Sequence, residues 1–533
     1  MQGWECPDSV FSVDAVAPRL VDPGSVFGFL ARHRADVFPR ASLDDMFADP
    51  VKGGQPSVPG PVVLSALLLE ALFNVSDRET AERLKYDLRW KAACGVGVDE
   101  DGFHHTVLVY WRNRIAASKN PGRVHDAVRQ VILECGAVKG KHRRVVDSTV
   151  VDDAVARQDA ITLLVWQIAK IAEILPGLRD RIWGLPGGAW YRDRSKPDID
   201  WASREAKDQA VSVLVGDARL VAGWALDQVA GLAEDDPGRV EAEDEAGLLG
   251  VLAGQDVEPA PGSDGTDGRW RIARRTARDR VISTVDRETR HVRKTGQDKH
   301  DGYKAHAVVE PDTGLVMDTV VSSACGDASS DARNAVGMLG RDPDVADGTV
   351  TEVFGDSAYD SEDLLGWADE NQVEPVVKPR PLPVAVPGGF TLDDFTADEQ
   401  EDTVTCPGGH TAARAVSGRA SFTRWCGSCP LKPMCTKARK GRVVTLGASQ
   451  LRRRRHRERA RGPEFVDRLR RHRPMVERSL AWLTRPGRRT PYRGITKTDA
   501  WFSLRAAAVN LKRLTSLGLA MLPGQGWVLN PAG

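Results

Sequence analysis

The sequence predicts an α/β protein in which a mixed five-stranded sheet carries helices on its faces, accompanied by several smaller units. Two observations support this class. Short β-rich runs occur as one strand, then a hairpin, then two further strands, and segments with apolar residues at helical spacing separate them. The chain has 533 residues. Because a single hydrophobic core stops growing well below that length, about two to four folded units are expected.

The N-terminal part, residues 1–125, is expected to form a helical domain that binds DNA. Residues 61–73 are an apolar run of helical length that ends at Asn74, and Ser76 and Glu79 have the spacing of a capping box. A further helix is expected at residues 107–116. Short helices joined by tight turns are compatible with a DNA-reading helix-turn-helix, and plain helical packing produces the same pattern.

The sheet is expected to come from residues 140–155 and 280–380. The first strand is a short β-rich run that ends at Asp147. The last is an edge strand, because Pro375 cannot donate to a neighbour. A hairpin is expected from residues 303–309 and 315–321, and a further strand at residues 350–354. Helices are expected at residues 331–339 and 361–371. This is the element order of an RNase H-like domain.

Three other segments lie outside this core. Residues 156–270 are expected to form a helical insertion, which ends in a linker or exposed loop where acids, Gly and Pro crowd residues 234–268. Residues 390–445 are rich in cysteine. Residues 446–520 are expected to be a basic helical part that returns to the core.

Composition excludes several classes of protein. Hydrophobic residues make up 41% and charged residues 28%, which is typical of folded globular chains and not of disordered ones. Polar residues interrupt the longest apolar segment, residues 160–175, so no membrane span and no membrane partner are expected. The first residues lack the regions of a signal peptide, which predicts a cytoplasmic location.

Charge is balanced overall and unevenly distributed. The chain has 74 basic and 74 acidic residues, but residues 437–493 hold 20 Lys and Arg against 4 acids. Local pairing acids are therefore scarce, and this density predicts a surface that binds a polyanion. The alternative interpretation is a solvated basic helix.

Two aspartates are the first candidates for chemistry. Phosphodiester cleavage at neutral pH can use two divalent metals held by converging carboxylates, and Mg²⁺ prefers such oxygen ligands. Asp147 and Asp356 each follow a β-rich run. In the RNase H-like order the first and fourth strands are neighbours, so the two side chains would meet. An aspartate in such a position, taken alone, is more often a cap or turn residue.

Several motifs resemble those of bacterial insertion-sequence DDE transposases with an InsH-type N-terminal domain. Residues 146–149 (Val-Asp-Ser-Thr) and 355–360 (Gly-Asp-Ser-Ala-Tyr-Asp) are similar to the first and second catalytic blocks, and residues 300–315 are similar to the hairpin of the family. Arg473 and Glu477 match the Arg-x3-Glu core of the third block. Arg470 stands where the family has Tyr, and Thr484 where it has Lys, which leaves open how those flanking residues bind DNA. Glu464 is the alternative if this alignment is wrong.

The resemblance extends from about residue 40 to residue 515 and implies a function. Asp147, Asp356 and Glu477 would hold two Mg²⁺ ions, or Mn²⁺, to cleave DNA at transposon ends and join those ends to a target. The partners would be terminal inverted repeats, target DNA and a second copy in a homodimer, and the protein would be associated with the nucleoid. The residues expected to bind DNA are Lys304, His306, Arg452, Arg453, Arg454, Arg455, Arg470, Arg473, Arg493 and Lys497.

Four of the eight cysteines lie within thirty residues: Cys406, Cys426, Cys429 and Cys435. This spacing predicts a closed structural Zn²⁺ site, in which His410 could replace one thiolate. Reduced, buried thiols are the alternative. One branch of the resembling transposases carries a similar zinc-ribbon-like insert at this place, with a structural or DNA-contacting role.

Two other functions remain open. A stand-alone RNase H-like nuclease would cut DNA without joining it. A catalytically inactive, zinc-containing DNA-binding protein derived from a transposase would do neither.

Overall fold

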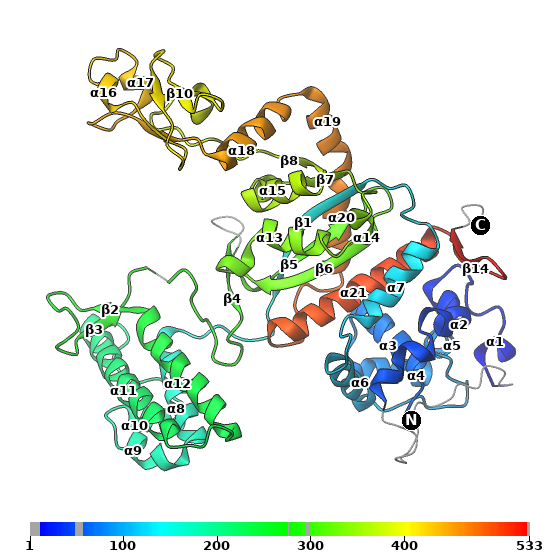
Figure 1. Ribbon diagram of the computed structural model, residues 1–533. Coiled ribbons are helices and arrows are strands. Elements are labelled where there is room, and N and C mark those ends of the chain that lie inside the picture. The colour runs from blue at the N-terminus through cyan, green and yellow to red at the C-terminus, as the bar shows by residue number, and fades with distance from the viewer. Residues whose placement is uncertain (1–10, 48–56, 276, 294–298, 530–533) are drawn as a thin grey trace.

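The computed structural model describes residues 11–47, 57–275, 277–293 and 299–529. Figure 1 shows a sheet in the middle of the molecule, with the N-terminal helices and a helical insertion on opposite sides below it and a small cysteine-rich module above it. Buried hydrophobic residues form four clusters. One joins the N-terminal helices to one face of the sheet, one lies on the other face, and the insertion and the cysteine-rich module each have their own.

The main sheet is mixed, as expected for the α/β class. In the described part of the chain it has six strands and not the five expected, because β4 pairs with β5 in addition to β6. The order is β4-β5-β1-β7-β8, with β6 also paired to β5. β1 is antiparallel to β5 and parallel to β7, and β7 is parallel to β8. β8 is the edge strand that Pro375 predicts. The bounds are β1 Arg143–Asp152, β4 Arg290–Arg293, β5 Lys299–Val309, β6 Val316–Ser323, β7 Glu352–Gly355 and β8 Glu374–Val377.

The alternation of side chains along β1 separates two faces of this sheet. Val145 packs with Leu480 of α20 (Pro474–Thr484) and with residues of α21 (Ile495–Ser516). Val146 instead joins the cluster that contains Ala332 of α13 (Asp331–Leu339). α14 (Pro343–Ala346) and α15 (Glu362–Glu370) lie between strands along the chain. Odd-numbered β1 residues therefore face α20, and even-numbered ones face α13.

The N-terminal unit is helical and packs on α21. α3 ends where Asn74 takes the left-handed conformation, with φ 53°. Half of the predicted capping box forms: the Ser76 hydroxyl accepts from the Glu79 amide, but the Glu79 carboxylate pairs with Arg83 instead of reaching back. The helices are α1 Val13–Val16, α2 Val26–Val37, α3 Gly60–Phe73, α4 Asp77–Tyr86, α5 Leu88–Cys94, α6 Thr106–Ala116 and α7 Arg123–Glu134, with a 3-10 turn at Arg40–Met46 and a C-terminal hairpin, β14 Leu519–Leu522 and β15 Gly526–Leu529.

The insertion has its own hydrophobic core, and the linker predicted at residues 234–268 is wrong in its first half. α12 spans Pro237–Gln255 and packs on α8 and α11 through Ala242, Ala246 and Leu249. These small and apolar residues recur every three to four positions, so Glu243 and Asp244 fall on the outer side of one helix. Glu245 is buried and accepts a hydrogen bond from Gln167 of α8. The other elements are α8 Ala160–Ile174, α9 Arg179–Trp183, α10 Gly188–Asp193, α11 Arg204–Ala230, β2 Val257–Pro259 and β3 Trp270–Ile272.

The cysteine-rich module consists of short strands around a core that includes Phe395, Val404 and Phe422. Its elements are β9 Thr396–Asp398, β10 Thr403–Thr405, β11 Thr411–Ala413, β12 Arg419–Ser421, α16 Thr423–Cys426, α17 Lys432–Cys435 and β13 Val443–Thr445. Two helices, α18 (Ala448–Arg459) and α19 (Pro463–His472), connect it to α20.

Among the described residues no single helix is long and apolar enough to cross a membrane. Two sharply bent helix pairs pass on length and composition alone: α3 with α4, and α8 with Pro176–Trp183.

Candidate active site

Asp147 lies in the middle of β1 and not at its end, which corrects the sequence-based expectation. The strand continues to Asp152 because the residues after Asp147 keep pairing with β5 as far as Gly302. Asp147 is odd-numbered and half-buried, so it faces α20 together with Val145. Its Oδ1 accepts a hydrogen bond of 2.8 Å from the Ser148 amide.

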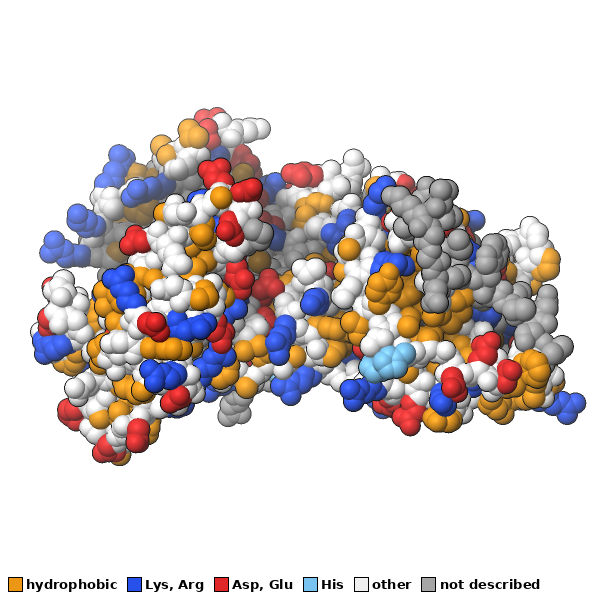
Figure 2. Space-filling model, turned by 90° about the horizontal axis from the view of Figure 1, so that it is seen from below, with side chains coloured by type: hydrophobic (Ala, Val, Ile, Leu, Met, Phe, Trp, Pro, Cys, Tyr) orange, Lys and Arg blue, Asp and Glu red, His pale blue; other side chains and the backbone are white. Residues whose placement is uncertain are grey.

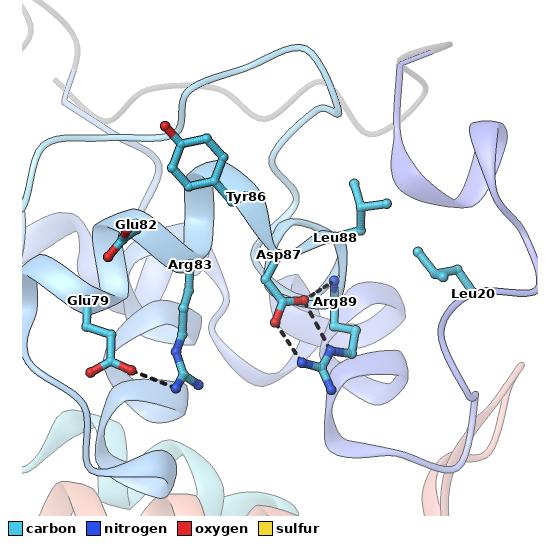
Figure 3. A pocket seen from close by; sticks show the side chains of 8 residues that line it. All are labelled: Leu20, Glu79, Glu82, Arg83, Tyr86, Asp87, Leu88 and Arg89. Atoms are coloured by element: carbon cyan, nitrogen blue, oxygen red, sulfur yellow. Dashed lines mark hydrogen bonds and ion pairs between the residues drawn. The ribbon is translucent and has the colours of Figure 1, made fainter.

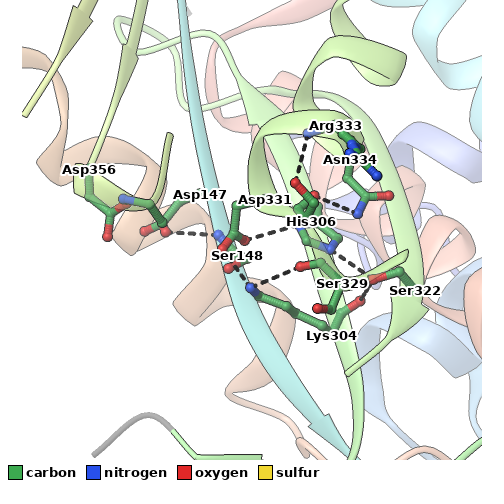
Figure 4. Close-up of polar contacts among 12 residues, drawn as sticks. Asp147, Ser148, Lys304, His306, Ser322, Ser329, Asp331, Arg333, Asn334 and Asp356 are labelled. Carbon is green, nitrogen blue, oxygen red and sulfur yellow. Dashed lines mark hydrogen bonds and ion pairs between the residues drawn. The ribbon is translucent and has the colours of Figure 1, made fainter. Parts of the chain in front are cut away.

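Asp356 directly follows β7, as predicted. Its Oδ1 accepts from the Ala358 amide at 2.8 Å and caps the short turn Ser357–Tyr359. β1 and β7 are parallel neighbours in which Val145 pairs with Phe354, and each aspartate lies two residues beyond that pair. Neighbouring strands are about 4.8 Å apart, so the two aspartates lie at the same level, side by side (Figure 4).

Glu477 reaches the same place from α20, where it lies in the first turn. Arg473 connects it to Asp356: one guanidinium nitrogen is 3.3 Å from Glu477 Oε1 and 3.9 Å from Asp356 Oδ2. Glu464 lies on the preceding helix, α19, beside Arg468. The shared arginine supports Glu477 over Glu464 as the third carboxylate. Arg473, which was expected to bind DNA, is here an acid-paired residue of the site.

The donor chemistry of these three carboxylates fits a hard divalent cation, which prefers oxygen ligands. A positive charge already stands between two of them, because the Arg473 guanidinium contacts both Asp356 and Glu477. In the described ranges, however, no group of three or more His, Cys, Asp or Glu side chains is close enough to hold a metal ion.

On the opposite face of β1, a buried network that the sequence did not reveal surrounds Asp331 (Figure 4). The Lys304 ammonium donates to Asp331 at 2.5 Å, and His306 Nδ1 lies 3.4 Å from the same carboxylate. Burial opposes ionisation of Asp331, but His306, Lys304 and the Ser148 hydroxyl outweigh it and hold its pKa well below the ordinary value. The sequence feature that could have revealed this network is the spacing of Lys304 and His306, which lie two positions apart on one strand. Since Ser148 pairs with His306 across the two strands, all three side chains lie on one face of the sheet.

Two predicted DNA contacts therefore change their role. His306 is fully buried, with Nε2 3.0 Å from the Ser322 hydroxyl, and burial lowers its pKa. Its side chain has no exposed surface in this structure, so a DNA contact by His306 is not supported by its position and stays a prediction. Lys304 is largely buried and paired with Asp331, because both side chains point to the α13 side.

Most of the arginines predicted to form a polyanion-binding helix are also paired. Arg452 binds Glu362 and Asp369 of α15, Arg453 donates to the Asp360 carbonyl, and Arg454 donates to the Phe395 carbonyl and to Glu458. Pairing acids are scarce in the neighbouring sequence, but Arg452 finds its two acids on the distant helix α15. Arg455 is 59% exposed, and its nearest acid, Glu399, is 3.8 Å away. Arg470, Arg493 and Lys497 are exposed, and their DNA contacts stay predictions.

The four clustered cysteines and His410 line one small cavity in the cysteine-rich module. A side chain at Gly408 would meet the sulfurs of both Cys406 and Cys429 within 3.6 Å. Burial raises the pKa of Cys435, as do the neighbouring thiols. His410 stacks on Trp425, with ring centroids 5.5 Å apart. The thiols are free and share a cavity, but they do not form a metal cluster in the described structure, so zinc stays a prediction.

A hollow lined by residues of α4 and α5, together with Leu20, opens on the N-terminal unit (Figure 3). Its two arginines are committed to neighbouring acids: Arg83 to Glu79 at 2.7 Å and Arg89 to Asp87 at 2.8 Å. None of the three candidate carboxylates lines it. It is therefore not the candidate active site.

Comparison with known proteins gives two family matches. Residues 23–114 match a model described as a transposase domain (DUF772), and residues 405–515 match a model described as a transposase DDE domain. The second match contains Glu477, whereas Asp147 and Asp356 lie in the stretch that neither match covers. No curated protein and no solved structure matches the chain.

Proposed function

Since the chain belongs to the insertion-sequence DDE transposases, we propose that it cleaves DNA at the ends of a transposable element and joins those ends to target DNA. Members of this family act on DNA and in general use divalent metal ions. The observation that supports the proposal is that Asp147 and Asp356 follow the same residue pair on neighbouring parallel strands, and that Arg473 links Asp356 to Glu477 of α20.

The sheet supports this function through its connectivity. The first strand is flanked by an antiparallel hairpin on one side and by two parallel strands on the other. We assign this order to an RNase H-like domain. In it the first and fourth strands are parallel neighbours, so residues more than two hundred positions apart share one site.

The three carboxylates would hold two Mg²⁺ ions, or Mn²⁺, which supply an activated nucleophile and a stabilised leaving oxygen. The protein's own groups set the geometry. The Ser148 amide orients Asp147, and the Ala358 amide orients Asp356. Arg473 balances the charge of Asp356 and Glu477 before a metal binds, which lowers the repulsion between them.

The other units receive supporting roles. The helical N-terminal domain would recognise the terminal inverted repeats, and the four clustered cysteines would hold a structural zinc ion. A homodimer fits a reaction that must cut two ends together.

Cleavage of a labelled duplex tests the catalytic assignment. The duplex carries the DNA that flanks the coding sequence, and Mg²⁺ or Mn²⁺ is added. Wild type should cut it, whereas Asp356→Asn and Glu477→Gln should not. Glu464→Gln is the matched control, because it removes the same charge from the preceding helix, and it should cut normally. Loss of cutting in Glu464→Gln with retention in Glu477→Gln would reassign the third carboxylate.

Joining separates a transposase from a nuclease. A duplex with a pre-cut end should be inserted into a second DNA molecule by wild type. Cutting without joining would favour the stand-alone nuclease, and binding without cutting would favour the inactive DNA-binding protein.

A further inference from the structure

Charge is unevenly distributed within the cysteine-rich module. All six of its acids lie before residue 403: Asp393, Asp394, Asp398, Glu399, Glu401 and Asp402. Residues 403–447 contain no Asp or Glu, whereas the chain as a whole has equal numbers of acids and bases. The same segment contains eight cations: Arg414, Arg419, Arg424, Lys432, Lys437, Arg439, Lys440 and Arg442. Nothing within the segment can therefore neutralise them through a carboxylate.

Three of these cations are engaged inside the module. Arg414 pairs with Asp402 and donates to the Leu446 carbonyl, Lys432 donates to the Arg439 carbonyl, and Arg442 lies over the Phe395 ring. The other five are exposed and have no ion pair within the described ranges: Arg419, Arg424, Lys437, Arg439 and Lys440. Arg424 is further ordered by Trp425, since its guanidinium carbon lies 4.0 Å from a ring centroid of that side chain.

The neighbouring helix α18 is equally basic but is used differently. Arg452 binds two acids of α15 on the sheet side, and Arg457 binds Asp393 at 2.5 Å next to the module. Arg454 donates to the Phe395 carbonyl in the core of the module. These contacts tie the module to the sheet through α18, and they occupy the guanidinium groups that would otherwise meet phosphates.

The face of the molecule seen from below has mixed charge. On the face in Figure 2, Lys and Arg side chains alternate with Asp and Glu across the insertion and the N-terminal helices. A mixed surface repels part of a polyanion wherever it attracts another part. Figure 1 shows the module projecting beyond α18, apart from those two units.

We propose that the acid-free part of the cysteine-rich module, residues 403–447, is a DNA-backbone-binding surface of this chain, with Arg419, Arg424, Lys437, Arg439 and Lys440 as its phosphate contacts. α18 connects this surface to the sheet through the contacts of Arg452, Arg454 and Arg457. The inference rests on the proposed function only in taking DNA as the partner. Contacts of this kind fix the position of a duplex without reading its sequence, and binding releases counterions, so affinity falls as salt rises.

The test measures binding of a short duplex of arbitrary sequence as a function of salt, with full-length protein carrying Asp356→Asn and without added Mg²⁺ or Mn²⁺. The variant Arg424→Gln, Lys437→Gln and Lys440→Gln should weaken binding on the order of tenfold or more. The slope of log K against log salt should shrink by about 0.9 for each phosphate that the variant no longer neutralises. A variant that carries Arg424→Lys instead of Arg424→Gln, together with the same two lysine substitutions, should bind more tightly than the triple Gln variant.

A control removes three exposed cations from the insertion: Arg181→Gln, Arg192→Gln and Arg204→Gln. It changes the net charge equally and should leave the salt slope nearly unchanged. An unaltered slope in the module variant, or an equal loss of affinity in the control, would overturn the proposal. The assay needs no cleavage. If wild type binds through the module and never cuts, the catalytic function fails and the surface stands; if wild type cuts and the module variant keeps its slope, only this inference fails.

Discussion

The two faces of β1 carry the same kinds of residue in opposite environments. On one face, Asp356 and Glu477 share Arg473, and their side chains are 34% and 57% exposed. On the other face, Asp331 pairs with Lys304 and His306, and the exposed fractions are 13% for Asp331 and 0% for His306. Neighbouring residues 147 and 148 belong to different faces because side chains alternate along a strand. An acid–base cluster beside the strand that carries Asp147 therefore need not belong to the candidate active site.

The largest contrast between the faces should appear in cleavage. Asp147→Asn removes a carboxylate from the exposed face and should lower the cleavage rate by on the order of a thousandfold or more, because metal ligation contributes several kcal/mol to the transition state. Asp331→Asn, on the buried face, should retain most of the rate. Single-turnover cleavage at saturating metal measures both. Equal losses would mean that both faces act in the reaction.

Stability should show the reverse order. Asp331→Ala leaves the largely buried Lys304 without its carboxylate partner, which costs about 3 kcal/mol in the free energy of unfolding. Asp327→Ala, close by on the same side of the sheet, removes an acid that is 96% exposed and should cost little. Urea unfolding at neutral pH compares the two variants. A cost as small for Asp331 as for Asp327 would contradict the structural role of the network.

Acid should weaken the buried face selectively. The pKa of Asp331 is lower in the folded protein than its ordinary value of 3.8. The ionised form is therefore favoured by folding: its stabilisation is complete above 3.8 and is lost as pH falls from there through the lower folded value. Unfolding followed from neutral pH into this acidic range should show a shallower decline for Asp331→Asn than for wild type. Parallel declines would show that Asp331 is not the titrating group.

The smallest effect should come from the boundary between the faces. Ser148→Ala keeps the amide that orients Asp147 and removes the hydroxyl that bonds Asp331. It should cost about 1 kcal/mol in stability, the ordinary contribution of one hydrogen bond, and leave cleavage within a few fold. Thermal unfolding and the cleavage assay together check this. A loss of cleavage comparable to that of Asp147→Asn would join the two faces into one functional unit.

Local patterns predicted the individual elements well. The apolar run and Asn74 predicted α3 and its end, Pro375 predicted the edge position of β8, and α13 begins and ends at the residues expected. The failures occurred where a local pattern has more than one tertiary outcome. Acids, Gly and Pro at residues 234–268 indicated a loop, but half of that stretch is α12, because its outer side tolerates charge while its inner side packs on α8 and α11.

The sequence alone determined the candidates: carboxylates after β-rich runs, four clustered cysteines and a basic C-terminal part, because residue type and spacing decide which chemistry is available. Only the tertiary structure decided which of them meet and which are already paired. Asp147 and Asp356 become neighbours through the parallel pairing of β1 and β7. Arg452 finds its acids on α15, eighty or more positions away. Pairing and burial depend on residues that are distant in the chain, and they decide whether a charge is available to a partner or holds the fold together.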